Sequence, residues 1–228
     1  RDLHYPLRRQ RQMCIRDSLE EYTRPARLRR NGKTVVLPAL SEVETLDFPE
    51  VGALEAFNTD GLRTLLKTCE TPELTEKTIR YPGHAEWMRG LRQTGFFDDR
   101  PMTFPDGTVS PLELTARLLD RAWAFEEGEE DLTVMRVRVE GIRDGRPERH
   151  TFSLLDRYDP ETRTSSMART TGYTATAMVR LLARGLYTVP GITPLELVGR
   201  ERTAFDFIMK DLEDRGIRFR HQVEEMEG

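Results

Sequence analysis

Apolar residues recur along the chain at two spacings, and each spacing predicts a different kind of element. Apolar and polar residues alternate from Thr133 to Glu140, which is typical of a strand with one buried face. The turn signal Asp144-Gly145 follows, and it predicts a hairpin with a second strand over 149–155. At 203–215 apolar residues instead recur every three or four positions, which predicts an amphipathic helix.

The same patterns predict the remaining elements. Residues 164–169 are expected to form the third strand of an antiparallel meander, and further strands are expected at 33–37, 44–48, 54–57, 76–81 and 216–223. Further helices are expected after capping boxes that begin at Ser110 and Thr193, and at 62–69, 84–93 and 173–184. Strands with helices between and after them predict an α+β fold, with a mixed, mostly antiparallel sheet covered by helices on one face. The open face of such a sheet would need a partner.

Residues 1–18 do not share these patterns. They hold five arginines, begin without methionine and show neither apolar period. One interpretation is a basic arm that binds an acidic partner. The other is a disordered or artefactual lead-in, which the string from Met13 to Ser18 favours because it resembles translated adapter sequence. We therefore expect residues 19–228 to form the domain and the natural protein to continue upstream.

Composition narrows the classes of partner. The 35 basic and 39 acidic residues are mixed along the chain, without the basic stripe that would predict nucleic-acid binding. No apolar run approaches the roughly 18 residues that a membrane span requires. Cys14 and Cys69 are isolated and the four histidines are scattered, so we expect no metal site and a reduced, cytoplasmic protein. The glycine-rich signatures of nucleotide binding are also missing from the sequence.

Three short polar stretches are candidates for a small-molecule site. The first is the corner between the strand at 76–81 and the helix that begins at His84. Arg80 at this strand end offers a guanidinium fork that suits a carboxylate, although an ion pair to a glutamate explains it equally well. Tyr81 lies beside it. His84 could carry a proton near neutral pH, or it could be a surface or capping residue.

The other two stretches lie ahead of predicted helices. Asn58, Thr59 and Asp60 precede one helix, so a plain N-cap accounts for at least one of them and leaves polar groups for a ligand. Residues 169–173 are expected to join the third meander strand to another helix, where backbone amides and hydroxyls would form an anion site. A simple hydroxyl cap is an equally economical alternative.

Six segments occur in an order and at spacings that carry a family resemblance. They are Glu21–Ala26, Leu37–Glu44, Leu54–Gly61, Lys77–Glu86, Met167–Tyr173 and Pro190–Pro194. Together they resemble the saccharopine dehydrogenase family, whose relatives include lysine 6-dehydrogenase. The resemblance implies a two-domain oxidoreductase of lysine metabolism. This chain would be its C-terminal domain only, which binds the amino-acid substrate and pairs with a second copy into a homodimer.

The resemblance also assigns roles to individual residues. It implies that Arg80 anchors a substrate carboxylate, with Tyr81, Asn58 and Asp60 near the substrate. The residues that it places close to the cleft between the domains are Arg169, Thr170 and Thr171. NAD or NADP would be held by a Rossmann domain that this chain lacks, so no residue here is assigned to the cofactor. The catalytic acid or base stays unassigned, and His84 is the candidate that the chain offers.

The implied reaction is hydride transfer at the carbon that bears the secondary amine of saccharopine. Hydrolysis of the resulting imine would give glutamate and aminoadipate semialdehyde. Oxidative deamination of lysine, as in the lysine 6-dehydrogenase type, is the first alternative, and a non-catalytic dimerising module is the second. Without the cofactor domain, we expect the chain alone to be inactive.

Overall fold

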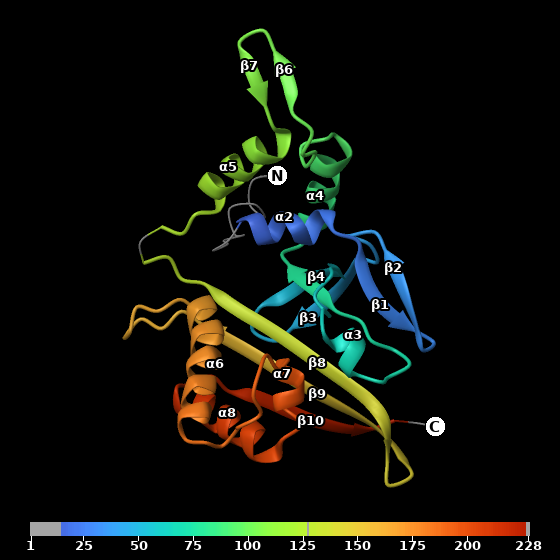
Figure 1. Cartoon of the computed structure of the whole chain (residues 1–228), viewed down its shortest axis with the longest axis vertical. Coiled ribbons are helices and arrows are strands. Elements are labelled where there is room, and N and C mark those ends of the chain that lie inside the picture. Colours follow the sequence, from blue (N-terminus) through green and yellow to red (C-terminus); the bar gives the residue numbers. More distant parts are fainter. Residues whose placement is uncertain (1–14, 127, 227–228) are drawn as a thin grey trace. The chain divides into compact units, whose positions relative to one another are not determined.

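The computed structural model describes residues 15–126 and 128–226. The described residues form two compact units, one within residues 15–126 (unit 1) and one within residues 128–226 (unit 2), and each unit has its own strands and helices (Figure 1). Of the predicted lead-in, residues 1–14 lie outside the described part. Residues 15–18 belong to the start of helix α2 (Ile15–Thr23).

The described part of unit 1 combines short helices with small antiparallel sheets. After α2 come the hairpin β1 (Ala26–Arg30) and β2 (Lys33–Leu37), and then a sheet in the order β3 (Glu44–Phe48), β4 (Gly52–Asn58), β5 (Lys77–Arg80). The other elements are α3 (Leu65–Thr68), α4 (His84–Gln93), the hairpin β6 (Met102–Phe104) and β7 (Gly107–Val109), and α5 (Pro111–Trp123). The strands predicted at 33–37, 44–48, 54–57 and 76–81 and the helix predicted at 84–93 are confirmed.

Three helices of unit 1 bury a shared aromatic core against strand β4. Tyr22 from α2, Met88 from α4 and Trp123 from α5 are at most 1% exposed, and they cluster with Phe57 from β4. Buried aromatic side chains remove large apolar areas from water and therefore dominate the stability of such a core. This core fixes α2 and α4 on the same side of β4.

The predicted N-cap at Ser110 and the proline at the first helical position are confirmed. The Ser110 hydroxyl accepts a hydrogen bond from the Glu113 amide at 3.3 Å, and Pro111 occupies the first helical position of α5. Both features satisfy or remove amide groups that a helix start leaves without partners.

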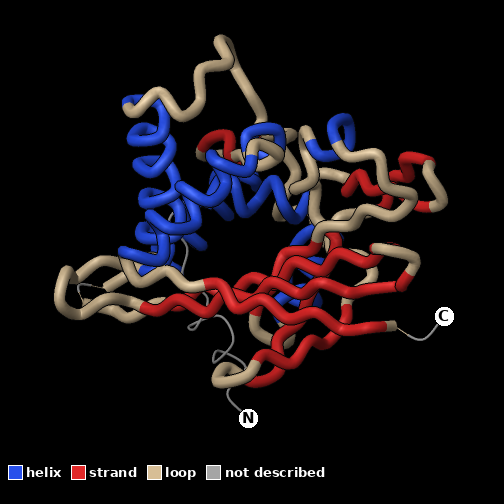
Figure 2. Tube along the Cα trace, turned by 90° about the horizontal axis from the view of Figure 1, so that it is seen from below, coloured by secondary structure: helices blue, strands red, loops and turns tan. Residues whose placement is uncertain are grey.

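Unit 2 is built on one three-stranded antiparallel sheet. Figure 2 shows its long strands lying side by side, in the order β8 (Leu132–Arg143), β9 (Arg146–Arg157), β10 (Phe219–Glu225). Helices α6 (Ser166–Ala183), α7 (Leu195–Val198) and α8 (Arg202–Asp214) come between β9 and β10. Leu154 and Phe219, which are opposite each other in the sheet, pack with Leu212 of α8 and Tyr173 of α6. Every strand pair that the structure describes is antiparallel, and the α+β class is confirmed.

Three details of the sequence prediction are wrong. Residues 164–169 do not form a strand, because Ser165 is the N-cap of α6 and its hydroxyl accepts from the Ala168 amide. The third strand of the meander is β10 instead, which pairs with β9. Thr193 does not cap a helix, since α7 starts after Pro194 and has no side-chain cap. The helix predicted at 62–69 is shortened to α3, because Arg63 has a positive φ of 48°.

Candidate functional site

The corner between β5 and α4 exists as the sequence predicts, and a buried carboxylate holds it. Gly83 is the N-cap of α4 with a φ of 93°, a conformation that a residue with a Cβ rarely adopts. The Glu55 carboxylate, 8% exposed on β4, accepts hydrogen bonds from the amides of Gly83, at 2.9 Å, and Ala85. A negative charge at a helix N-terminus satisfies free amides and opposes the positive end of the helix dipole. The amides at the start of α4 are therefore already bound by a carboxylate of the protein itself.

Arg80 lies opposite Glu55 in the β4–β5 ladder and carries a largely buried guanidinium. Its Nη2 donates to the Glu21 carboxylate of α2 at 2.9 Å, and its Nη1 donates to the Ile79 carbonyl. The Nε is buried and has no acceptor. Both readings of the sequence thus have support, because Arg80 forms an ion pair and still has an unused donor. Tyr81 lies next to it in the chain and is partly buried.

His84 is a core residue in this structure. It is 2% exposed, and its Nε2 lies 2.9 Å from the Tyr22 hydroxyl. The rings of Tyr22, Phe57 and Trp123 surround it, with centroids 5.4 to 6.3 Å away. Burial, with a smaller effect from the charge of Arg80, lowers the pKa of His84 to about 3. The imidazole is therefore neutral and shielded from solvent at pH 7, which favours a packing role over proton transfer.

The structure separates Asn58 from Arg80. Asn58 pairs with Lys77 at one end of the β4–β5 ladder, whereas Arg80 pairs with Glu55 at the other. Because side chains alternate along a strand, Asn58 and Arg80 point to opposite faces of the sheet. The Asn58 amide donates to Ser41 and to the Glu42 carboxylate, on the face away from Arg80. The two predicted substrate residues therefore do not converge within this sheet.

The polar residues that follow Asn58 are also bound by other parts of unit 1. Asp60 receives two side-chain hydrogen bonds from Arg27, each 2.8 Å long, and one from the Arg27 amide. The Arg27 side chain thereby lowers the pKa of Asp60 below its usual value. The Thr59 hydroxyl donates to Glu76, and the same carboxylate accepts from the Gly61 amide. The contacts of Thr59 and Asp60 therefore connect the end of β4 to β1 and to the residue before β5, which is a structural role.

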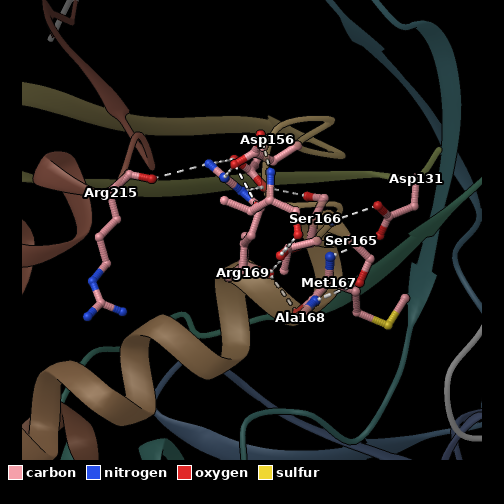
Figure 3. Close-up of polar contacts among 12 residues, drawn as sticks. Asp131, Asp156, Ser165, Ser166, Met167, Ala168, Arg169 and Arg215 are labelled. Carbon is pink, nitrogen blue, oxygen red and sulfur yellow. Dashed lines mark hydrogen bonds and ion pairs between the residues drawn. The ribbon is translucent and has the colours of Figure 1, made fainter. Parts of the chain in front are cut away.

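In unit 2, Arg169 is the centre of a buried polar network, which Figure 3 shows. Its guanidinium contacts both carboxylate oxygens of Asp156 at 3.3 Å and Asp159 at 2.8 Å. It also donates to the Arg215 carbonyl at the end of α8, and Asp156 accepts from the Ser166 hydroxyl at 2.7 Å. Only 9% of the Arg169 side chain is exposed. One side chain thus connects the end of β9, the start of α6 and the end of α8.

Thr170 and Thr171 lie within α6 and not ahead of it. Their hydroxyls donate to carbonyls of the preceding turn, at Ser166 and Met167. The true N-terminus of α6 is occupied by Asp131, whose carboxylate accepts from the Ser166 amide at 2.6 Å and the Met167 amide at 2.9 Å (Figure 3). The predicted anion site ahead of a helix at 169–173 is therefore wrong. A substrate role for Arg169, Thr170 and Thr171 stays a prediction.

Sequence reasoning missed the acidic residues that organise both units. Glu55 is a charged residue inside an otherwise apolar strand segment, which is the signal that could have identified it. Asp131 carried no such signal because it follows the acidic residues of 126–130, and Asp156 carried none because it begins the mostly polar stretch of 156–163. Among the described residues, no group of three or more His, Cys, Asp or Glu side chains could hold a metal ion. None of the described helices is long and apolar enough to cross a membrane.

Comparisons with known proteins agree on one family. A model of the saccharopine dehydrogenase C-terminal domain matches residues 14–217. The saccharopine dehydrogenase (NADP(+), L-glutamate-forming) of Schizosaccharomyces pombe is 28% identical over 106 residues, which cover 46% of this chain and 23% of the relative. Apo saccharopine dehydrogenase (L-Glu forming) from Saccharomyces cerevisiae shares the fold, with a TM-score of 0.75 and 18% identity over 96% of this chain and 63% of that chain.

The fold and these matches define the class of this protein, which is an α+β domain of an oxidoreductase family. The chain belongs to the saccharopine dehydrogenase family and carries its C-terminal domain. It spans less than two thirds of the length of both relatives.

The buried His84 makes the stability of unit 1 depend on pH. The unfolded chain takes up a proton near pH 6.5, whereas the folded chain does not until about pH 3, so stability is full above pH 6.5 and falls as the pH decreases. We expect this group to remove about 2 kcal/mol of the free energy of unfolding between pH 7 and pH 5. Both tryptophans lie in unit 1, so urea unfolding at each pH, followed by tryptophan fluorescence, measures the free energy of unfolding of this unit. The loss should vanish in His84→Gln and persist in the control His150→Gln; an unchanged pH dependence in His84→Gln would contradict this account.

Arg169→Met should destabilise unit 2 by about 3–5 kcal/mol, because it leaves the buried Asp156 carboxylate without its cation. Hydrogen exchange of amides in β9 and α6 measures the change. The control is Arg202→Met, which removes an exposed ion pair with Asp206 in the same unit and should cost less than about 1 kcal/mol. Equal effects of the two substitutions would show that the Arg169 network adds little to the stability of unit 2.

Proposed function

We propose that this chain is the substrate-binding part of an NAD(P)-dependent oxidoreductase of lysine metabolism that acts on saccharopine. The family membership and the activities of the two relatives support the proposal. The observation that carries it is the buried guanidinium of Arg80, which ends a strand and keeps one donor without an acceptor. A substrate with several carboxylates suits such a group, because a guanidinium binds a carboxylate through two charge-assisted hydrogen bonds.

The helix N-termini at the two candidate stretches, those of α4 and α6, do not fit the nicotinamide cofactor. Dinucleotide phosphates bind at helix N-termini, but in this chain the N-termini of α4 and α6 already hold the carboxylates of Glu55 and Asp131. The sequence also has no glycine-rich phosphate-binding loop. We therefore assign NAD or NADP to a separate Rossmann domain. Bound there, NAD or NADP would supply the hydride acceptor for oxidation at the carbon that bears the secondary amine of saccharopine, a reaction whose products after hydrolysis are glutamate and aminoadipate semialdehyde.

The residues of this chain would bind and orient the substrate. Arg80 is held by Glu21, so a substrate carboxylate either shares the guanidinium with Glu21 or replaces it. Burial of this pair keeps the site in low dielectric, where a correctly placed carboxylate is bound more strongly than in water. Tyr81 would flank the bound carboxylate at the same corner. His84 would support the corner from the core through Tyr22.

Arg80→Ala should weaken saccharopine binding at least tenfold, since hydrogen bonds to charged groups contribute about 1.5–3 kcal/mol. Isothermal titration of this chain with saccharopine measures the affinity. Glu21→Gln is the matched test, because removing the competing carboxylate should strengthen binding. If Arg80→Ala binds as tightly as the unsubstituted chain, Arg80 is structural and the proposed anchor is wrong.

Two alternatives predict different titrations. A lysine 6-dehydrogenase type would bind lysine, which has one carboxylate, in preference to saccharopine. A non-catalytic dimerising module would bind neither amino acid. The cytoplasmic location stays a prediction of composition, as does the absence of nucleic acid and membrane partners.

The family resemblance also implies a homodimer, and unit 2 offers a surface for it. Val137, Val139 and Val223 share the sheet face of Leu154 by register, yet they are 43%, 56% and 52% exposed. A second copy presents the same apolar surface, so the two can pair around a two-fold axis. Because Leu154 of this face packs against α8, the surface is the exposed part of the helix-covered face and not the open face for which the sequence predicts a partner.

Val139→Asp should shift a homodimer to monomers, because it places a charge in the apolar surface. Sedimentation velocity over a range of concentrations measures the shift. Thr151→Asp adds the same charge to the opposite face of the sheet and should leave the dimer intact. A monomeric unsubstituted chain would exclude the dimer, and a dimer that tolerates Val139→Asp would exclude this surface.

A further inference from the structure

A groove in unit 1 lies between α4 and the segment at 38–43, and it does not contain Arg80. Its volume is about 380 Å³, within the range of small-molecule sites. The segment forms one wall, and Arg89 and Arg92 of α4 form the other. Residues three apart on a helix lie on the same face, so both guanidinium groups are directed to one side of α4.

The two arginines carry positive charge that the protein does not neutralise. Arg92 donates to the carbonyls of Tyr22, at 3.1 Å, and Ala39, at 3.0 Å, which are uncharged acceptors. The Nε of Arg89 is buried and has no acceptor. Among the described residues, no carboxylate forms an ion pair with either arginine. Burial, followed by the nearby charge of Arg89, lowers the pKa of Arg92. An anion between the two groups would relieve this repulsion.

The other wall of the groove is mainly apolar. Its apolar residues are Pro38, Ala39, Leu40 and Val43, of which Pro38 and Val43 are exposed while Ala39 and Leu40 are buried behind them. The Glu42 carboxylate at its end is already bound by Arg30 and Asn58, whose hydrogen bonds lower its pKa. A small hydrated anion gains nothing from such a wall, whereas an aliphatic chain would bury apolar surface against it.

Asn58 holds the shape of this wall. Its amide nitrogen donates to the Ser41 carbonyl, and its own carbonyl accepts from the Leu40 amide. Its side chain donates to Ser41 and Glu42. Leu40 and Glu42 have positive φ values of 62° and 49°, which persist only where surrounding contacts fix them. Asn58, on the opposite sheet face from Arg80, is thus a positioning residue for the groove.

We propose that this groove binds the carboxylate of an aliphatic organic acid, with Arg89 and Arg92 as its charge partners and the segment at 38–43 as its apolar wall. The site is separate from the Arg80 anchor and does not depend on the proposed function. It takes ligands that combine a carboxylate with a short hydrocarbon chain.

The test is a titration with glutarate in the Arg80→Ala background, so that the Arg80 anchor cannot contribute. The Nε–Hε resonance of Arg89, followed by NMR, reports binding at the groove itself. Glutarate should shift this resonance in a saturable way, and Arg89→Gln should weaken glutarate binding at least tenfold by isothermal titration. Arg121→Gln, which removes an exposed arginine of α5 in the same unit, is the charge control and should bind normally.

Two further probes separate the parts of the proposal. Glutaramide has the same hydrocarbon chain without charge and should not bind. Inorganic phosphate should bind more weakly than glutarate, because it cannot use the apolar wall. The proposal is overturned if glutarate leaves the Arg89 resonance unchanged, if Arg89→Gln binds as well as its parent, or if phosphate or glutaramide matches glutarate.

Discussion

Carboxylates at helix N-termini, that of Glu55 buried and that of Asp131 partly buried, are the constraint on which both units depend. A helix that starts inside a protein leaves amides without acceptors, and water cannot supply them there. Glu55 of β4 meets the start of α4, and Asp131, just before β8, meets the start of α6. Each carboxylate connects a helix to a sheet and sets where the helix begins. The Arg80 corner and the Arg169 network are built directly on these two starting points.

Because many polar side chains stabilise the fold in this way, few of them are free to bind a ligand. Asp60, Thr59 and Arg169 each have well-placed protein partners, and their charges or hydroxyls serve the fold. Among the described residues, buried donors without an acceptor remain at Arg80, Arg89 and Trp123, and Trp123 lies inside the aromatic core of unit 1. Such a donor is costly in a stable fold, so those of Arg80 and Arg89, which lie outside that core, are the candidates for contact with a ligand. A high density of polar residues in the sequence was a poorer guide than the balance of donors and acceptors.

Local patterns predicted most elements, because their causes are local. The alternation over 133–140, the Ser110 cap and the turn at Pro82-Gly83 each act within a few residues, and the structure has β8, α5 and the start of α4 there. Residues 164–169 were misassigned because the start of α6 is fixed by Asp131, which lies 35 residues before Ser166. No local pattern contains that contact.

The candidate site was harder to predict for a related reason. Asn58 and Arg80 are each the last residue of a strand, and only the register of β4 and β5 places them on opposite faces. A shift of one residue in that pairing would bring them to the same face. The pairing of the strands, and not the position of the residues in the sequence, therefore decides which of these side chains lie on the same face.

The order of strands in unit 2 has a consequence for how the chain is made. β8 and β9 form a hairpin early, but β9 receives its second neighbour, β10, only after the residues at 158–218 have been added. Until then the edge of β9 has free amides and carbonyls and can pair with another chain. A nascent or shortened product that ends within α8 would expose this edge, so aggregation during synthesis is the particular hazard of this topology.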